Sequence, residues 1–435
     1  MSFSLTAEET NRRLMRFVDR SPCAYYAVAN LKEELLQQGF QELEEQEPWT
    51  LTSGGRYFVC RNGSSLISFI LPPDQIRSFH VMASHNDSPS FKIKPGPALR
   101  STCGLLRAST EKYGGPIDST WFDRPLSVSG RVLVEENGGI SARLVYPEKV
   151  TMMLPSVAPH LLRKEHGSEP LDTQDRMYPV IGAGNDGMLL WSLIAKELKV
   201  FPEQILSSDL YLCNREAARI WGTGNEFLSA PRLDDLASCY GSFLGFLDSR
   251  SCSGAVAVHA AFDNEEVGSR TMQGADSGFM RVTLERICSC TGLGREEFHR
   301  AVAGSLLISA DNAHALHPNY EHLSDPENHP CLNRGLVVKY QSAQRYATDG
   351  VSAALFQTIC RQHGIPYQTF TNRQGSIGGS TLGHLSVSQI PLRTADIGLP
   401  QLAMHSCYET MGTGDTAALA AFSAAFYGEP LPEIR

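Results

Sequence analysis

Three short apolar stretches, each followed at once by carboxylates, asparagine or histidine, constrain the fold more than any other feature of this sequence. They are FHVMAS before His85-Asn86-Asp87, AVAVHAAF before Asp263-Asn264-Glu265-Glu266, and LLISA before Asp311-Asn312-Ala313-His314. Continuous apolar runs of this length are typical of strands that are buried on both faces of a sheet. Because ligands bind outside the carboxyl ends of the strands in open parallel sheets, we expect these polar groups to share one crevice.

Helix and strand patterns alternate at both ends of the chain. Thr6-Ala7-Glu8-Glu9 has the form of a capping box, and Leu14, Phe17 and Val18 give the following helix an apolar face. Further patterns predict helices at 31–38, 236–247 and 351–360, and strands at 65–71, 79–83, 255–262 and 305–310. We therefore predict an α/β domain that is built from both ends of the chain.

The middle of the chain has a different texture. From about 92 to 221, clusters such as Pro95-Gly96-Pro97, Gly114-Gly115-Pro116 and Asn137-Gly138-Gly139 separate segments of alternating character. This pattern favours hairpins and meanders, interrupted by one amphipathic helix at 186–199. We expect residues 1–91 and 222–435 to form the α/β domain, and residues 92–221 to form an inserted β-rich domain.

Charge and composition exclude several classes of protein. The net charge of −9 and the lack of a basic stripe argue against a nucleic-acid binder. The sequence has no apolar signal-like region at its start and nothing near ~18 consecutive apolar residues, so we expect a cytoplasmic protein that does not cross a membrane. The eleven cysteines include no Cys-x-x-Cys pair, and we expect reduced thiols.

Two adjacent glutamates, Glu265 and Glu266, directly follow the strand pattern at 255–262. Like charges repel, so this pair is either exposed to water or held by cations. A solvated turn explains the pair if it is considered alone, and a helix cap explains Asp234-Asp235 in the same way.

The histidines also have ordinary explanations one by one. His85 and Asp87 would form a loop hydrogen bond, and His405 would be a common core or surface histidine. Taken together, carboxylates and imidazoles without Cys-x-x-Cys spacing favour a hydrolytic centre that holds two zinc, manganese or cobalt ions.

A count of charges supports two ions. If Asp234 bridges them while His85, Glu266, Asp311 and His405 complete the ligand shells, three carboxylates leave +1 of the charge of two divalent ions. That residual charge suits a bound hydroxide. Glu265, whose side chain diverges from that of its neighbour, would accept a proton from water and return it to a leaving amine.

Seven motifs, in order along nearly the whole chain, resemble those of the M18 aspartyl aminopeptidases, a family of dinuclear zinc exopeptidases. They are SHNDSP (84–89), TWFDRPLS (120–127), PRLDDL (231–236), DNEEVGS (263–269), SADNAHALHPNY (309–320), QRYATDG (344–350) and LPQLAMHS (399–406). The resemblance implies a phosphorylase/hydrolase-like metallopeptidase domain with a mixed sheet and helices on both faces. It also implies an inserted dimerisation domain and a homododecamer assembled from dimers.

The resemblance further implies roles for individual residues. The implied metal ligands are His85, Asp234, Glu266, Asp311 and His405, with Asp234 bridging. Glu265 is implied as the catalytic base and Asp87 as the acid that orients the centre. Asn86, a threonine in many relatives, and Asp235, often an asparagine, depart from the family pattern without affecting a ligand.

Three more residues are implied to meet the substrate. Lys339 corresponds to the residue that faces an acidic first side chain, and His317 resembles a residue near the reacting carbonyl. His160 looks like the histidine that reaches the site of a neighbouring subunit. Without the resemblance, Lys339 would be a solvated charge on a strand edge, and the two histidines would be loop hydrogen-bonding groups.

We therefore expect an aminopeptidase that removes N-terminal Asp or Glu from peptides with two divalent ions, Zn²⁺ first among them. A tetrahedral aminopeptidase of the M42 type shares the His-x-Asp triplet and an EEVGSR-like stretch, but HALHPNY and AMHS favour M18. The alternative outside the enzymes is a catalytically silent scaffold, and the five intact ligand positions count against it.

Overall fold

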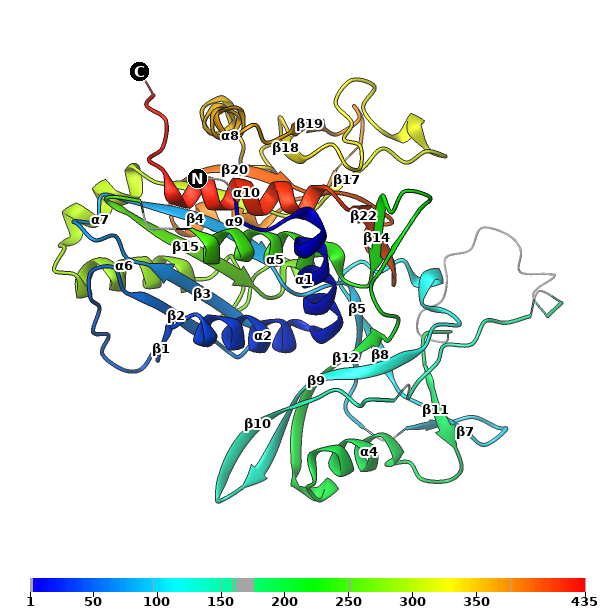
Figure 1. The fold of residues 1–435 in the computed structure, drawn as a ribbon. Coiled ribbons are helices and arrows are strands. Elements are labelled where there is room, and N and C mark those ends of the chain that lie inside the picture. The colour runs from blue at the N-terminus through cyan, green and yellow to red at the C-terminus, as the bar shows by residue number, and fades with distance from the viewer. Residues whose placement is uncertain are drawn as a thin grey trace.

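The computed structural model describes residues 3–96, 98–149, 151–158, 160–161, 176–249, 252–376 and 378–434. Its centre is a nine-stranded mixed sheet (Figure 1). In spatial order the strands are β1 (Gln41–Leu43), β2 (Arg56–Arg61), β3 (Ser65–Ile70), β15 (Ala255–Phe262), β4 (Ser78–His85), β16 (Leu306–Ala310), β20 (Arg393–Gly398), β18 (Leu336–Tyr340) and β19 (Tyr367–Thr371). Strands β15, β4, β16 and β20 run parallel to one another, so their carboxyl ends meet at one edge.

Helices cover both faces of this sheet, as the sequence predicted. One face carries α1 (Ala7–Arg20), α2 (Ala24–Gln37), α5 (Leu233–Asp248), α8 (Gly350–His363) and α10 (Asp415–Gly428). The other carries α6 (Phe279–Cys290), α7 (Arg295–Ala303) and α9 (Leu382–Gln389). Adjacent residues of β4 divide between the two cores: Met82 packs with the first group of helices, and Val81 and Ala83 with the second.

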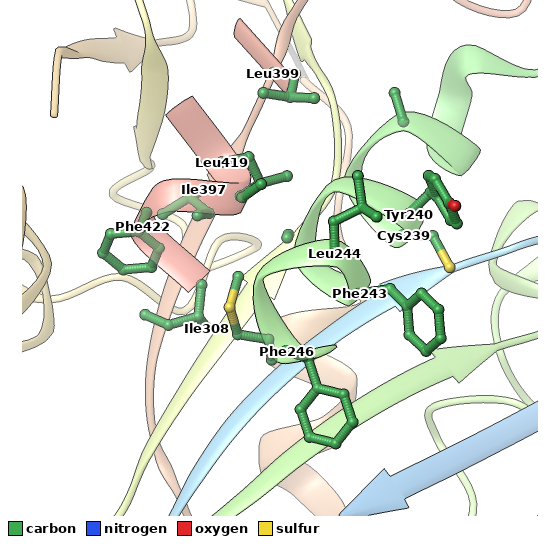
Figure 2. Packing of buried hydrophobic residues seen from close by; sticks show 14 of the residues in the cluster. Cys239, Tyr240, Phe243, Leu244, Phe246, Ile308, Ile397, Leu399, Leu419 and Phe422 are labelled. Carbon is green, nitrogen blue, oxygen red and sulfur yellow. The ribbon is translucent and has the colours of Figure 1, made fainter. Parts of the chain in front are cut away.

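A close helix contact fixes the element that begins with the acidic pair Asp234-Asp235. Helix α5 packs against α10, and Leu244 of α5 and Leu419 of α10 belong to the same buried core (Figure 2). A Cβ atom at Gly245 would lie 2.3 Å from the carbonyl oxygen of Ala420, so only glycine allows this approach. This packing therefore holds α5, which carries the acidic pair near its start, closely against α10.

The middle of the chain forms two smaller sheets, which we call the insert (residues 90–214). A five-stranded sheet consists of β10 (Gly139–Val145), β9 (Leu126–Glu136), β12 (Ile205–Asn214), β5 (Ser90–Ile93) and β8 (Thr110–Tyr113). A three-stranded sheet consists of β11 (Val180–Ala183), β7 (Leu105–Arg107) and β6 (Leu99–Arg100), and α4 (Leu189–Leu198) packs nearby. Figure 1 shows the insert below the main sheet.

A fourth sheet joins segments from the second half of the chain. It consists of β13 (Arg219–Trp221), β14 (Phe227–Ala230), β22 (Glu409–Gly412), β21 (Pro400–Leu402) and β17 (Ala313–His314). Sheet membership thus changes at Ser90 and again between Asn214 and Arg219. The predicted domain division at 92 and 221 stays a prediction.

Most predicted elements are present, with two differences at helix starts. Helix α2 begins at Ala24 rather than at residue 31, because Ala27 and Val28 pack into the core although Cys23 makes no side-chain cap. Helix α4 begins at Leu189 rather than at residue 186, and Asp186 instead accepts a hydrogen bond from the Met188 backbone. Within the described ranges, no helix combines the length and apolar content needed to cross a bilayer.

Candidate metal centre

The five predicted ligands come from distant parts of the chain and meet at the carboxyl edge of the main sheet. Each follows or precedes a strand or helix that the core holds in place. His85 ends β4, Asp311 follows β16, Glu266 lies in a 3₁₀ turn after β15, Asp234 lies at the start of α5, and His405 lies in the turn between β21 and β22. All five line one cavity.

The first cluster of donor atoms, here called the inner group, consists of His85, Asp234 and Asp311. One possible ligand atom from each lies within 4.8 Å of the other two. His85 Nε2 is 3.5 Å from Asp234 Oδ1, and the side chains of His85 and Asp234 are almost fully buried. Asp234 Oδ1 has no hydrogen-bond partner in the described part of the chain.

The second cluster, the outer group, consists of Asp234, Glu266 and His405. His405 Nε2 lies 3.5 Å from Asp234 Oδ2 and 3.7 Å from Glu266 Oε2. The two oxygens of the Asp234 carboxylate therefore face different groups: Oδ1 faces the inner one and Oδ2 the outer one.

Backbone hydrogen bonds fix the shared aspartate and the outer histidine together. Glu409, which is buried at the start of β22, accepts from the Asp234 N–H at 3.0 Å and from the His405 N–H at 2.7 Å. Asp235 is also buried, and its Oδ2 accepts from the His85 N–H at 3.3 Å. The adjacent acids 234 and 235 thus lie in different environments.

Asp87 touches several parts of the site at once. Its backbone oxygen lies 3.1 Å and its Oδ1 3.3 Å from His85 Nδ1. Its carboxylate also accepts from the N–H groups of Glu265 and Glu266 at 3.1 Å and 3.2 Å. These contacts place Asp87 where it can orient His85 and the 3₁₀ turn; its predicted role in orienting the centre stays a prediction.

The electrostatics of the cluster are unfavourable without added positive charge. Burial raises the pKa of Glu266 well above its ordinary value, and the nearby Asp234 raises it further. Burial also raises the pKa of Glu265 to about 8, although His85 opposes the shift. Burial lowers the pKa of His85, but its contacts with Asp234 and Asp87 outweigh this, and the net shift is upward.

These residues fit divalent metal ions. The donors are carboxylate oxygens and imidazole nitrogens, which suit zinc, manganese or cobalt. A bound cation would satisfy the orphaned Oδ1 of Asp234 and offset the crowded negative charges. Both histidines also direct Nδ1 to oxygen atoms, which leaves Nε2 free to face an ion.

The predicted substrate residues are distributed differently. Lys339 lines the same cavity with only 3% of its surface exposed; Nζ donates to the Asn312 carbonyl at 2.8 Å and lies 3.6 Å from Asp311 Oδ1. The interpretation of Lys339 as a solvated charge on the edge of a sheet is therefore wrong. His317 lines a neighbouring cavity, while His314, to which sequence reasoning gave no role, lines both.

His160 lies on the surface, and Pro159 before it falls outside the described residues. The predicted role of His160 requires a second chain, so it stays a prediction.

The insert contributes a contact that the sequence analysis missed. Tyr113 at the end of β8 donates its hydroxyl to Asp87 Oδ2 at 2.7 Å, and the Gly115 carbonyl lies 3.0 Å from His405 Nδ1. Gly114-Gly115-Pro116 signalled only a turn in the sequence. The role of Glu409 could not be predicted from the sequence, because its partners are backbone N–H groups of residues that only the fold brings close to it.

Comparison with known proteins identifies the family of the chain. The family model described as Aminopeptidase I zinc metalloprotease (M18) matches residues 17–427. The chain is 41% identical over 415 residues to Probable M18 family aminopeptidase 2 of Clostridium acetobutylicum, covering 94% of this chain and 96% of that protein.

Two solved structures show the same fold. One, described as the cryo-EM structure of the Ape4 and Nbr1 complex, has a TM-score of 0.93 and 35% identity, and covers 98% of this chain and 88% of that chain. The other, described as the S. cerevesiae mApe1 dodecamer, has a TM-score of 0.85 and 26% identity, and covers 97% and 96%. The chain therefore belongs to the M18 family of zinc aminopeptidases and is a metal-dependent aminopeptidase.

Proposed function

We propose that this enzyme removes one N-terminal residue, preferably Asp or Glu, from peptides by using two zinc ions that share Asp234. The observation that carries the proposal is the division of the Asp234 carboxylate, with one oxygen facing His85 and the other facing His405. His85 and Asp311 would complete the inner position, and Glu266 and His405 the outer one. Manganese or cobalt would suit the same donors.

Glu265 is the proposed proton carrier. When bound, two zinc ions would supply a water of lowered pKa and polarise the substrate carbonyl. The Glu265 carboxylate lines the same cavity, within 4.8 Å of donor atoms of His85 and Glu266. It would accept the proton of the attacking water and donate it to the leaving amine.

The adjacent glutamates provide the test of this assignment. Glu265→Gln should keep two zinc ions per chain and lose activity by about 10²–10⁴-fold, the usual contribution of a general base. Glu266→Gln should instead lose the outer zinc. Metal analysis and peptide hydrolysis on the same preparations separate the two effects, and full activity of Glu265→Gln with normal zinc would refute the base assignment.

A wild-type protein that holds zinc but hydrolyses no peptide would favour the alternative that the protein is a catalytically silent scaffold.

Lys339 is the proposed selector of acidic substrates. Its buried ammonium group lines the cavity, where it would meet a carboxylate side chain of the substrate, and the phenol ring of Tyr346 lies 5.5 Å away. The contact with Asp311 offers a competing role, since Lys339 could simply support that ligand.

Matched variants separate selection from support. Lys339→Met keeps length and removes charge, while Lys339→Arg keeps charge. Selection predicts that Lys339→Met lowers kcat/KM on an aspartyl substrate about a hundredfold more than on a leucyl substrate, the scale of a lost charge-assisted bond. Equal losses on both substrates would identify Lys339 as a positioning residue for Asp311.

A homo-oligomer that shares residues between chains is proposed from the likeness to the mApe1 dodecamer. We expect His160 of one chain to reach the site of another. A mixed assembly of His160→Ala and Glu265→Gln chains should then regain activity, up to about a quarter of wild type with random pairing. No recovery in assemblies shown to be mixed would refute the sharing.

Two histidines are candidates for contact with the substrate carbonyl. The resemblance favours His317, whereas His314 lines the cavity that contains the donor groups. His317→Ala should lower kcat more than His314→Ala if the resemblance holds, and the reverse order would transfer the role to His314. We further propose a cytoplasmic location, where the eleven cysteines of the sequence would stay reduced.

A further inference from the structure

The segment Tyr113-Gly114-Gly115 of the insert lies against the proposed ligands. Tyr113 ends β8, whose register pairs it with Ser90 of β5, shortly after His85 and Asp87 in the chain. Its phenol ring is 8% exposed and packs edge-on against Tyr211. The insert therefore enters the centre on a strand that its own sheet holds in place.

Gly115 orients the outer histidine. Its carbonyl oxygen lies 3.0 Å from His405 Nδ1, so the Nδ1–H donates and Nε2 keeps its lone pair toward Asp234 and Glu266. The Ile117 N–H donates to the His405 carbonyl at 3.0 Å, which extends the same attachment.

Gly114 closes against the outer glutamate. A Cβ atom at this position would lie 3.0 Å from Glu266 Cβ and 3.2 Å from Glu266 Oε2. The backbone φ of +70° also disfavours any side chain. Glycine is thus the residue that lets the insert support Glu266 without displacing it.

Tyr113 reaches the inner histidine through Asp87. The tyrosine hydroxyl donates to Asp87 Oδ2 at 2.7 Å and accepts from Asn264 Nδ2 at 2.8 Å. Asp87 in turn faces His85 Nδ1. Three consecutive residues of the insert therefore act on both histidines.

We propose that Tyr113, Gly114 and Gly115 are positioning residues of the metal centre, so that tight zinc binding depends on the insert. This rests on the proposed two-zinc site. Gly115 and Gly114 support the outer group directly, and Tyr113 supports the inner group through Asp87. The insert would then determine metal affinity in each chain in addition to any role in assembly.

Zinc extraction from the full-length, zinc-loaded protein tests the proposal. Increasing concentrations of a chromophoric chelator should remove two zinc ions in separable steps, and the step altered in Glu266→Gln identifies the outer one. Gly114→Ala should weaken the outer step by about 10–100-fold. Tyr113→Phe should weaken the inner step by a similar factor, and it should also affect the outer step, because Asp87 Oδ2 accepts from the Glu266 N–H.

Matched controls separate positioning from general destabilisation. Gly138→Ala has nearly the same backbone strain, with φ +75°, but its Cβ would have no atom within 4 Å. Tyr211→Phe likewise removes one buried tyrosine hydroxyl, but from the ring that packs on Tyr113. Extraction curves of Gly114→Ala and Tyr113→Phe that match these controls would overturn the proposal; if Gly114→Ala does not fold, Tyr113→Phe decides.

The unfolding midpoint of each variant should stay near that of its control. If Gly114 or Tyr113 served general stability instead, its substitution would lower the midpoint. A wild type with fewer than two zinc ions, or normal zinc in Asp234→Asn, would instead refute the two-zinc site itself.

Discussion

The inner and outer groups share Asp234 but are built in different ways. The inner group draws His85 and Asp311 from the ends of adjacent strands, and the His85 side chain is 2% exposed. The outer group draws Glu266 and His405 from turns, and the His405 side chain is 34% exposed. A ligand on a packed strand is held by the core, whereas a ligand on a turn needs further contacts, here from Glu409 and the insert.

The shared aspartate gives the largest expected effect. Asp234→Asn should lose both zinc ions and reduce peptide hydrolysis to background, because each oxygen faces one group. Asp235→Asn is the matched control: its oxygen can still accept from the His85 N–H, and both zinc ions should remain. If Asp234→Asn and Asp235→Asn keep zinc equally, Asp234 is not the residue that the inner and outer groups share in binding zinc.

Removal of one histidine should distinguish the groups. His405→Gln should reduce zinc from two ions to one per chain, since the inner group keeps all its members. His85→Gln should lose more zinc than His405→Gln, because His85 belongs to the inner group and also lies close to Glu265 and Glu266. Elemental analysis after gel filtration measures this, and retention of two ions by His405→Gln would contradict the outer position.

Substitution of Glu409, which holds the backbone of Asp234 and His405, should have a smaller effect on zinc binding. Glu409→Gln replaces one carboxylate oxygen by an amide, which leaves either the Asp234 or the His405 N–H facing a donor. We expect zinc affinity to fall about 10–100-fold, with the outer ion released first. Chelator competition measures the affinities; selective loss of the inner ion would be the wrong order.

The smallest effect concerns acid stability beneath the inner group. Burial lowers the pKa of His80 on β4 to about 4, although a hydrogen bond with the Phe426 carbonyl opposes the shift. Below about pH 6.5, His80 therefore binds a proton in the unfolded chain but stays neutral in the folded chain. As a result, the free energy of unfolding falls as the pH drops from 6.5 toward 4.

Between pH 7 and pH 5 this histidine should cost about 2 kcal/mol of unfolding free energy. The pH dependence of urea unfolding in wild type and in His80→Gln isolates the contribution, because other groups cancel in the difference. His259, whose pKa burial likewise lowers to about 4, serves as a second example. Equal pH dependence of wild type and variant would show that His80 is not held neutral.

The sequence predicted the main sheet and the meeting of His85, Glu266 and Asp311, three of the five proposed ligands, because both depend on local signals. Buried strands leave apolar runs, and the residues after β4, β15 and β16 must meet where those parallel strands end. The start of α2 was missed because Cys23 makes no side-chain cap.

The supporting contacts could not be predicted in the same way. Gly115 and His405 are 290 residues apart, and their contact depends on how the insert docks. Lys339 lies on a short strand whose sequence does not tell which side chains enter the cavity. Long-range docking, rather than local pattern, decides these positions.

Anomalous X-ray scattering at the zinc edge, measured on crystals of the zinc-loaded protein, would show whether two zinc ions share Asp234. We predict two zinc peaks in each chain, about 3.5–4 Å apart. One should contact His85 and Asp311, the other Glu266 and His405, and Asp234 should contact both. A single peak, or two peaks that do not share Asp234, would contradict it.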